Sequence, residues 1–285
     1  MITKPMIFAA GFVLALATSS CSNEAGKETD GTQTDTIATG RPVSLKEEKL
    51  SYKADTITAN GYVVYNDNQE GKRPAVLIVH EWWGQNDYVK TRAKQLAEMG
   101  YIAMAVDMFG RGRIASNPDE AQALAGPFYQ NPQLARTRLD AALQQLKGLA
   151  QTDTSQVAAI GYCFGGFVVL NAAKLGADLD GVVSFHGNLG GAPVSKSNLK
   201  ARVMIAHGAA DPFVPEAEVA AFRKAMDSVG ADYIFKAYQN ATHAFTNPTA
   251  TETGKRFNLP IAYNPTADSA SWNDMKAFFS TLFQQ

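Results

Sequence analysis

Residues 157–166 read VAAIGYCFGG, and this stretch decides the fold of the chain. Its first four residues form a short apolar run that is typical of a strand buried on both faces. Cys163 then lies between Gly161 and Gly165, and an apolar segment with helical character follows. A nucleophile flanked by glycines in this way marks a sharp turn from a strand into a helix. The sequence therefore predicts a strand, a tight turn and a helix, with the Cys163 side chain exposed at the turn.

This turn would place the Cys163 thiol where it can react. A helix N-terminus carries a partial positive charge, which favours the thiolate form of a cysteine. The amide of Phe164 would point to where an oxyanion forms on a bound carbonyl group. A buried structural cysteine in a glycine-rich turn would give the same letters, so the motif by itself leaves both interpretations open.

Strands and helices alternate on both sides of the turn. Asn60 and Gly61 lie between two runs of alternating apolar and polar residues, which predicts a hairpin over residues 50–65. Further strands are expected at 75–79, 101–106, 157–160, 182–185, 203–206 and 233–238, and helices at 88–99, from 131 onward, 216–229 and 268–283. The alternation indicates an α/β protein with a mainly parallel central sheet and helices on both faces.

Two further residues complete a possible catalytic triad by their order along the chain. Hydrolases with this kind of turn place the nucleophile first, the acid second and the histidine last. Asp211 follows one expected strand and His243 follows the next, although Asp211 would also suit a helix cap. The other three histidines precede Asp211 and are expected to be structural or pocket-lining: His80, His186 and His207.

Taken together, these motifs resemble the dienelactone hydrolases of the α/β-hydrolase fold. The resemblance extends from about residue 45 to the C-terminus. It rests on HEWWG at 80–84, DMFGR at 107–111, GYCFGG at 161–166, Asp211 and HAF at 243–245. It implies a Cys163–His243–Asp211 triad that hydrolyses an ester or lactone through a thiol acyl-enzyme.

The resemblance also assigns roles to residues around the triad. In the family a glutamate contacts the resting nucleophile and helps to form the thiolate as substrate binds, and it matches Glu81. The amide of Trp82 would be a second oxyanion donor, and Trp83 is expected to line the substrate pocket. Two arginines hold the substrate carboxylate in the family. Arg111 matches the first, but the second matches Asn247, a neutral amide that cannot replace a guanidinium.

The N-terminal segment is expected to be an export signal followed by a tether. Residues 1–20 combine a weakly basic start, an apolar run and small residues, which is the layout of a secretory signal. Cys21 follows directly and resembles the lipid-attachment cysteine of a bacterial lipoprotein, with ordinary signal cleavage as the alternative. Residues 21–44 are rich in Thr, Gly, Asp and Glu and are expected to be flexible. The hydrolase domain would then occupy 45–285 in the periplasm or cell envelope.

Composition excludes several other classes of protein. The chain has 285 residues, 46% of them hydrophobic, which excludes a disordered protein. Its net charge of −1 lacks the basic excess of a nucleic-acid binder. Its two cysteines are too few for a disulfide-stapled scaffold. No metal-ligand spacing and no phosphate-binding loop is visible, so no cofactor and no metal is expected.

The expected partners are a small ester or lactone and, through the lipid, a membrane. The sequence leaves the oligomeric state open, with a monomer favoured. The main alternative function is a non-catalytic lipoprotein that binds a ligand in the same pocket, because function depends on the site and not on the fold. A thiol redox protein is a further alternative, although the chain has no C-x-x-C motif.

Overall fold

The structure is a computed structural model, and it describes residues 42–283. The expected signal peptide, Cys21 and the tether up to residue 41 lie outside the described residues. The strands are β1 (Leu45–Ala54), β2 (Ile57–Asn66), β3 (Arg73–Val79), β4 (Ile102–Val106), β5 (Thr152–Tyr162), β6 (Gly181–Phe185), β7 (Arg202–Gly208) and β8 (Tyr233–Tyr238).

These strands form one sheet in the order β1-β2-β4-β3-β5-β6-β7-β8. β2 is antiparallel to both β1 and β4, and every other neighbouring pair is parallel. The predicted mainly parallel sheet with an N-terminal antiparallel hairpin is therefore confirmed. Because the parallel strands share one direction, the loops after β3, β5, β7 and β8 emerge at the same edge of the sheet, where ligands bind in such folds.

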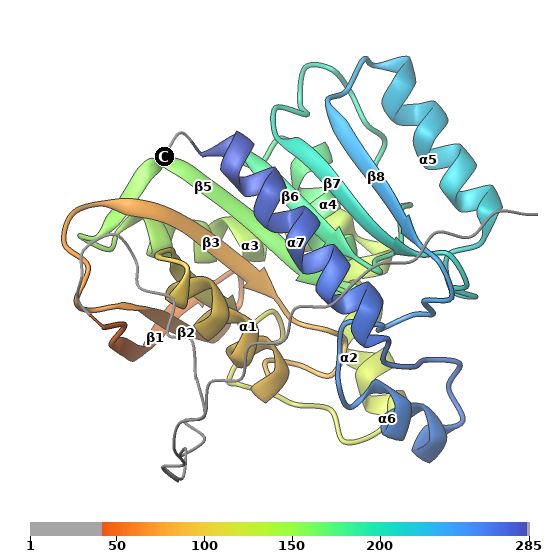
Figure 1. Ribbon diagram of the computed structural model, residues 1–285, viewed down its shortest axis with the longest axis horizontal. Helices are drawn as coiled ribbons and strands as arrows, with labels where there is room; N and C mark the ends of the chain where they lie inside the picture. Colours follow the sequence, from red (N-terminus) through yellow and green to blue (C-terminus); the bar gives the residue numbers. More distant parts are fainter. Residues whose placement is uncertain (1–41, 284–285) are drawn as a thin grey trace, which may run out of the picture. The chain divides into compact units, whose positions relative to one another are not determined.

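Helices cover both faces of the sheet (Figure 1). α1 and α7 pack on one face, and α2, α3, α4 and α5 contribute to the core on the other. None of the helices within residues 42–283 is both long enough and apolar enough to cross a membrane. The helices are α1 (Asp87–Glu98), α2 (Pro118–Gln130), α3 (Pro132–Lys147), α4 (Phe164–Lys174), α5 (Glu216–Ser228), α6 (Ala250–Phe257) and α7 (Pro265–Leu282).

The central strand β3 shows how the core holds the sheet in place. Leu77 and Val79 face the helices α3 and α4, whereas Val76 and Ile78 face α1 and α7, and all four side chains are fully buried. Each such side chain contributes about 1.5–3 kcal/mol to folding. The end of β3 is therefore anchored from both faces, and the loop that begins there starts from a fixed position.

The predicted position of the hairpin turn is wrong. The hairpin exists, but Ala54 pairs with Ile57, so the chain turns at Asp55 and Thr56 and not at Asn60 and Gly61. Asp55 has φ 54°, a left-handed conformation that aspartate adopts more readily than most residues. Gly61 lies inside β2, where an added Cβ would be 2.4 Å from Cε of Met104. The glycine at this position allows close packing between strands.

Two of the helices, α2 and α6, were not predicted from the sequence. The side chain of Asn117 accepts a hydrogen bond from the amide of Glu120 and caps the start of α2. Pro127 lies inside this helix and interrupts the helical sequence pattern by which α2 could be recognised. A proline removes one helical hydrogen bond and usually marks a helix end. α6 is only 8 residues long and ends at Asn258 in the left-handed conformation, so its apolar periodicity is too short to recognise.

Candidate active site

Cys163 occupies a strained turn between β5 and α4. Its backbone has φ 54° and ψ −114°, a combination that costs a non-glycine residue about 1–3 kcal/mol. A Cβ on Gly161 would lie 2.0 Å from the carbonyl oxygen of Gly165, and a Cβ on Gly165 would lie 2.2 Å from that of Val79. Both positions must therefore be glycine for α4 to start against β3 and β5. The predicted strand, turn and helix around Cys163 are confirmed.

His243 and Asp211 meet at the same edge of the sheet, as their order along the chain predicts. Nδ1 of His243 lies 2.8 Å from Oδ2 of Asp211, and both side chains are buried. The other carboxylate oxygen of Asp211 accepts a hydrogen bond from the amide of Phe213 at 2.9 Å. The Asp211 carboxylate is thus held in place and can fix both the tautomer and the orientation of the imidazole.

The imidazole of His243 lines the same pocket as the Cys163 thiol. Burial alone would lower the pKa of His243, but the charge of Cys163 and the hydrogen bond to Asp211 raise this pKa to about 10. His243 is therefore suited to hold a proton in this site. Proton transfer from the thiol to the imidazole can generate the nucleophile within this arrangement.

Glu81 is buried in the loop that follows β3. Its Oε2 accepts a hydrogen bond from Nδ2 of Asn247 at 2.6 Å. Within residues 42–283, this amide is its hydrogen-bond partner, and Cys163 is not. Burial raises the pKa of Glu81 to about 7, against the opposing effects of Asn247, His243 and Arg92. A neutral amide lowers the pKa of a carboxylate less than a cation does, which fits a carboxyl group that is partly protonated near pH 7.

Asn247 is oriented by a neighbour on its own loop. Its Oδ1 accepts hydrogen bonds from the amide and the hydroxyl of Thr249, both at 3.0 Å. Because the amide oxygen is occupied in this way, the Nδ2 group must point toward Glu81. Asn247 therefore lines the pocket, and its side-chain amide donates its hydrogen bond to the Glu81 carboxyl group.

His80 holds the loop that carries Glu81 and Trp82. Nε2 of His80 accepts a hydrogen bond from the amide of Met108 at 3.3 Å, so the ring proton is on Nδ1. This N–H donates a hydrogen bond to the Glu81 carbonyl at 2.5 Å. Burial lowers the pKa of His80 to about 4, which keeps this ring neutral. His80 thus has a structural role.

The two expected oxyanion donors are backbone amides on the segments that follow β3 and β5. Phe164 is the first residue of α4, so its N–H has no carbonyl acceptor within the helix. Trp82 lies on the loop fixed by His80, and its side chain lines the same pocket as Cys163. These two amides come from the loop after β3 and the turn after β5, which are neighbouring strands.

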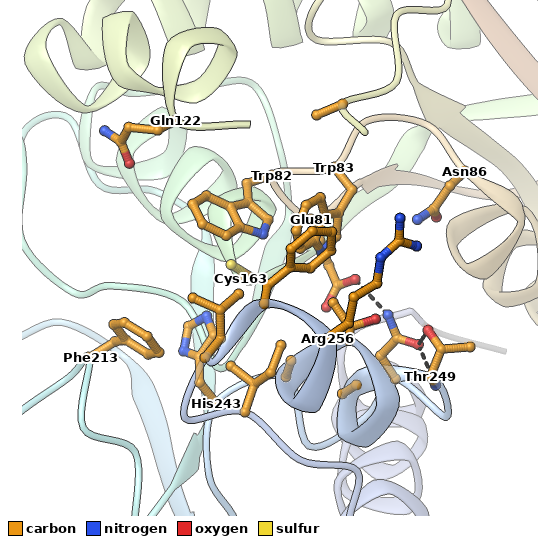
Figure 2. Close-up of a pocket in the computed structure, with 18 of the residues that line it drawn as sticks. Glu81, Trp82, Trp83, Asn86, Gln122, Cys163, Phe213, His243, Thr249 and Arg256 are labelled. Atoms are coloured by element: carbon orange, nitrogen blue, oxygen red, sulfur yellow. Dashed lines mark hydrogen bonds between the residues drawn. The ribbon is translucent and has the colours of Figure 1, made fainter. Parts of the chain in front are cut away.

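The pocket above the thiol has a volume of about 600 Å³. Figure 2 shows Cys163, His243 and Trp82 in its wall, with Phe213 and Arg256 on opposite sides of the view. The ring of Trp83 stacks on that of Phe257, with 5.7 Å between centroids. The apolar part of the wall consists of Trp82, Trp83, Ile114, Ala115, Phe213, Ala244, Ala250, Phe257, Leu259 and Ile261, with Tyr129 beside them.

The expected substrate-binding residue Arg111 is not brought to this pocket. Its loop is held by Asp107, whose two carboxylate oxygens accept hydrogen bonds from the amides of Gly110 and Gly112 at 2.7 and 2.8 Å. The amide of Arg111 donates to the carbonyl of Thr58 on β2, and the residue is exposed. Arg111 is absent from the residues that line the pocket in the described part of the chain.

Within residues 42–283, Arg256 is the only lysine or arginine that lines the pocket. It lies near the end of α6, and its guanidinium is 4.9 Å from the ring centroid of Phe257. Arg256 was not among the residues predicted from the sequence, because α6 itself was not predicted. No motif in the sequence marks Arg256, since its position depends on how α6 packs against the loop after β3.

The sequence profile of the dienelactone hydrolase family matches residues 59–283. The chain belongs to this family. A protein of Aquifex aeolicus, provisionally named a carboxymethylenebutenolidase, is 26% identical over 242 residues, which cover 83% of this chain and 99% of the relative. A protein of Bradyrhizobium, provisionally named a 2-oxo-3-(5-oxofuran-2-ylidene)propanoate lactonase, is 26% identical over 72% of this chain and 82% of its own.

Solved structures of the dienelactone hydrolase family superpose well on this chain. One is a dienelactone hydrolase-like promiscuous phosphotriesterase from metagenomic libraries. It is 32% identical, has a TM-score of 0.79, and covers 84% of this chain and 99% of its own. A second, from Klebsiella pneumoniae, is 20% identical with a TM-score of 0.70 and covers 83% of this chain and 99% of its own, which supports the fold alone. The α/β-hydrolase fold expected from the sequence is confirmed.

The buried carboxyl group of Glu81 predicts a specific pH dependence of stability. The pKa of Glu81 rises from 4.5 to about 7 on folding, so its stabilising contribution is complete below pH 4.5 and is lost as the pH rises to about 7. The free energy of unfolding of Glu81→Gln, relative to the wild type, should therefore increase by on the order of 3 kcal/mol between pH 4 and pH 7.5. Urea denaturation at each pH measures this difference, with the exposed Glu98→Gln as the control. A flat difference for Glu81→Gln would contradict the raised pKa.

Proposed function

We propose that this protein hydrolyses a carboxylic ester or lactone with Cys163 as the nucleophile, through a thiol acyl-enzyme. The observation that carries the proposal is that the Cys163 thiol shares its pocket with the His243 imidazole, which Asp211 orients through a contact of 2.8 Å. The strained turn presents this thiol to a largely apolar pocket. Membership of a hydrolase family supports the same reaction, and the names of the relatives refer to cyclic esters.

In the acylation half-reaction His243 takes the proton of Cys163, and the thiolate attacks the carbonyl carbon. The amides of Phe164 and Trp82 donate hydrogen bonds to the tetrahedral oxyanion. His243 then returns the proton to the leaving alkoxide, and the C–O bond breaks to leave a thioester on Cys163. When the substrate is a lactone, the released alcohol remains part of the acyl group.

In the deacylation half-reaction His243 takes a proton from water, which attacks the thioester carbonyl. The second tetrahedral intermediate collapses, the carboxylic acid leaves, and the proton returns to the Cys163 sulfur. Asp211 stabilises the imidazolium in both halves of the reaction. This sequence consumes one water molecule for each ester bond and needs no cofactor.

Glu81 is assigned a role in thiolate formation when substrate binds, as the resemblance implies. Its carboxyl group lines the pocket together with Cys163 and His243. A pKa of about 7 makes both of its protonation states accessible near neutral pH. Full turnover by the Glu81→Gln variant would remove Glu81 from the mechanism.

Loss of the nucleophile and loss of the base should both abolish turnover. Cys163→Ala and His243→Ala are each expected to lower kcat for a 4-nitrophenyl ester by about 10³-fold or more. His207→Ala should change kcat by less than about threefold, because His207 packs against Phe235 and does not line the pocket. Steady-state kinetics measure all three effects. Retained turnover in Cys163→Ala would refute the mechanism.

The main alternative is a non-catalytic protein that binds a ligand in this pocket. The connected Cys163, His243 and Asp211 side chains favour catalysis, because a binding pocket does not require a thiol, an imidazole and a carboxylate in series. If the wild type turned over no ester or lactone while still binding an aromatic carboxylate, the alternative would replace the proposal.

We further propose that the substrate carries a negative charge and that Arg256 binds it. Arg256 is the single lysine or arginine in the pocket wall within the described residues. Burial raises the pKa of Glu81, the acidic side chain in the same wall, to about 7, which reduces its negative charge near neutral pH and limits repulsion of an anion. Trp83 and Phe257 provide an aromatic surface next to the guanidinium.

Neutralising Arg256 should therefore affect anionic esters selectively. For the 4-nitrophenyl monoester of succinate, Arg256→Gln is expected to raise KM about 10-fold or more, since a charged hydrogen bond contributes about 1.5–3 kcal/mol. For the neutral 4-nitrophenyl butyrate, KM should change by less than about twofold. The exposed neighbour Lys255→Gln is the matched control. An equal change in KM for the two esters in Arg256→Gln would contradict a charge-specific role. If KM for the anionic ester rose only in Arg111→Gln, the substrate anion would instead bind Arg111.

Export and lipid attachment at Cys21 are also proposed, from the layout of residues 1–21. Cells that express the protein should incorporate labelled palmitate into the wild type and not into Cys21→Ser. Labelling that survives in Cys21→Ser would contradict the proposed attachment site, and a labelled product that remains in the cytoplasm would contradict export.

A further inference from the structure

Two buried side chains outside the triad connect the turn at Cys163 to the loop that carries His243. They are His186, which follows β6, and Thr246, which lies three residues after His243. His186 Nε2 lies 2.7 Å from the hydroxyl of Thr246. Both side chains are fully or almost fully enclosed, at 1% and 0% exposure. Neither His186 nor Thr246 belongs to the proposed Cys163–His243–Asp211 triad.

On one side His186 holds the backbone of the nucleophile. Its Nδ1 accepts a hydrogen bond from the Cys163 amide at 3.1 Å, and the same amide also donates to the Phe185 carbonyl at 2.9 Å. Because Nδ1 is an acceptor, the proton of the neutral ring must be on Nε2, which donates to Thr246. Burial, together with the charges of His243 and Arg92, lowers the pKa of His186 well below its usual range.

On the other side Thr246 is held by groups from α1. Its hydroxyl lies 2.6 Å from the hydroxyl of Tyr88, and its carbonyl accepts a hydrogen bond from Nη2 of Arg92 at 2.8 Å. Arg92 is itself paired with Asp268 at the start of α7. The loop that carries His243 and Asn247 is therefore anchored at Thr246 through both its side chain and its backbone.

We propose that Thr246 and His186 are positioning residues that set the place of the His243 imidazole relative to the Cys163 thiol. The inference rests on the proposed triad. The Cys163 turn belongs to β5 and α4, whereas His243 follows β8, which is three strands away in the sheet. The bridge from the Cys163 amide through His186 to Thr246 joins these two segments directly. A displacement of about 1 Å between reacting groups can lower a rate about 100-fold, so the bridge matters for turnover.

The isosteric variant Thr246→Val tests the bridge. It keeps the shape of the side chain and removes the hydroxyl that His186 contacts. It should lower kcat for 4-nitrophenyl butyrate about 10- to 100-fold and change KM by less than about twofold, because substrate binding does not use this hydroxyl. Thr246→Ser restores the hydroxyl and should return kcat to within about threefold of the wild type.

Thr152→Val is the matched control for a simple loss of stability. Thr152 is buried at the start of β5, away from the pocket, and its hydroxyl donates to the Leu146 carbonyl at 2.8 Å. Thr152→Val loses one buried hydroxyl hydrogen bond, and Thr246→Val loses its contacts with both His186 and Tyr88, so the melting temperature should fall in both variants. Only Thr246→Val should lose kcat. An equal kcat in the two Val variants, or an equal loss in Thr246→Ser and Thr246→Val, would overturn the proposal.

His186→Asn tests the other end of the bridge. His186 has φ 42°, which asparagine tolerates well, and Oδ1 of asparagine can replace Nδ1 as the acceptor for the Cys163 amide. Asparagine is too short to reach Thr246. His186→Asn should therefore lower kcat as Thr246→Val does, and the double variant should lose no more than the worse single variant. Additive losses in the double variant would show that the two residues act separately and would overturn the bridge.

Alkylation of Cys163 by iodoacetamide separates this inference from the proposed hydrolysis, because it needs no substrate. At pH 7 the alkylation rate should fall about fivefold or more in Thr246→Val and stay within about twofold of the wild type in Thr152→Val. If the wild type turned over no ester but the variants showed this pattern of alkylation, the proposed hydrolysis would be refuted and the positioning role of His186 and Thr246 would stand. If ester turnover were normal and the alkylation rates were equal in all variants, the proposed hydrolysis would stand and the positioning role would be overturned.

Discussion

Gly161 and Gly165 bring β3, β5 and the start of α4 so close that no side chain fits between them. This contact forces Cys163 into its left-handed conformation and directs the thiol away from the sheet. Since the core clamps β3 from both faces, the strain cannot relax by moving the strand. The proposed oxyanion amides, the imidazole and the pocket therefore all depend on a thiol whose position is set by backbone packing.

The charges in the site are balanced by burial as much as by pairing. The pKa of His243 is raised beside Cys163 and Asp211, whereas burial raises the pKa of Glu81, which a neutral amide contacts. Burial thus reduces the negative charge on Glu81 near neutral pH. Under the proposed function, this lowers the repulsion between Glu81 and an anionic substrate that binds Arg256 on the pocket wall.

The sequence was sufficient to identify the fold and to predict that the three residues of the proposed triad gather at one edge of the sheet, because each lies on the segment that follows a strand of a parallel sheet. Chain order then determines which residues meet at the sheet edge, and Cys163, Asp211 and His243 follow that rule. Arg256 could not be found in this way, since it depends on the packing of a short helix. His186 and Thr246 were also out of reach, because a buried hydrogen bond between two loops has no periodic signal. The position of the hairpin turn was predicted wrongly for a related reason, because Gly61 allows close packing against Met104 and does not form a turn.

The loop from His243 to Asn247 combines the imidazole, the Thr246 anchor and the amide that holds Glu81 within five consecutive residues. Under the proposed mechanism, a substitution of His243, Thr246 or Asn247 disturbs the acid–base chemistry, so natural selection would have little freedom at these positions. Ile114 and Phe257, by contrast, reach the pocket from other segments and take no part in the hydrogen bonds described for the triad. Divergence of substrate range among descendants of such an enzyme should therefore concentrate in α6 and around Ile114, while the histidine loop changes slowly.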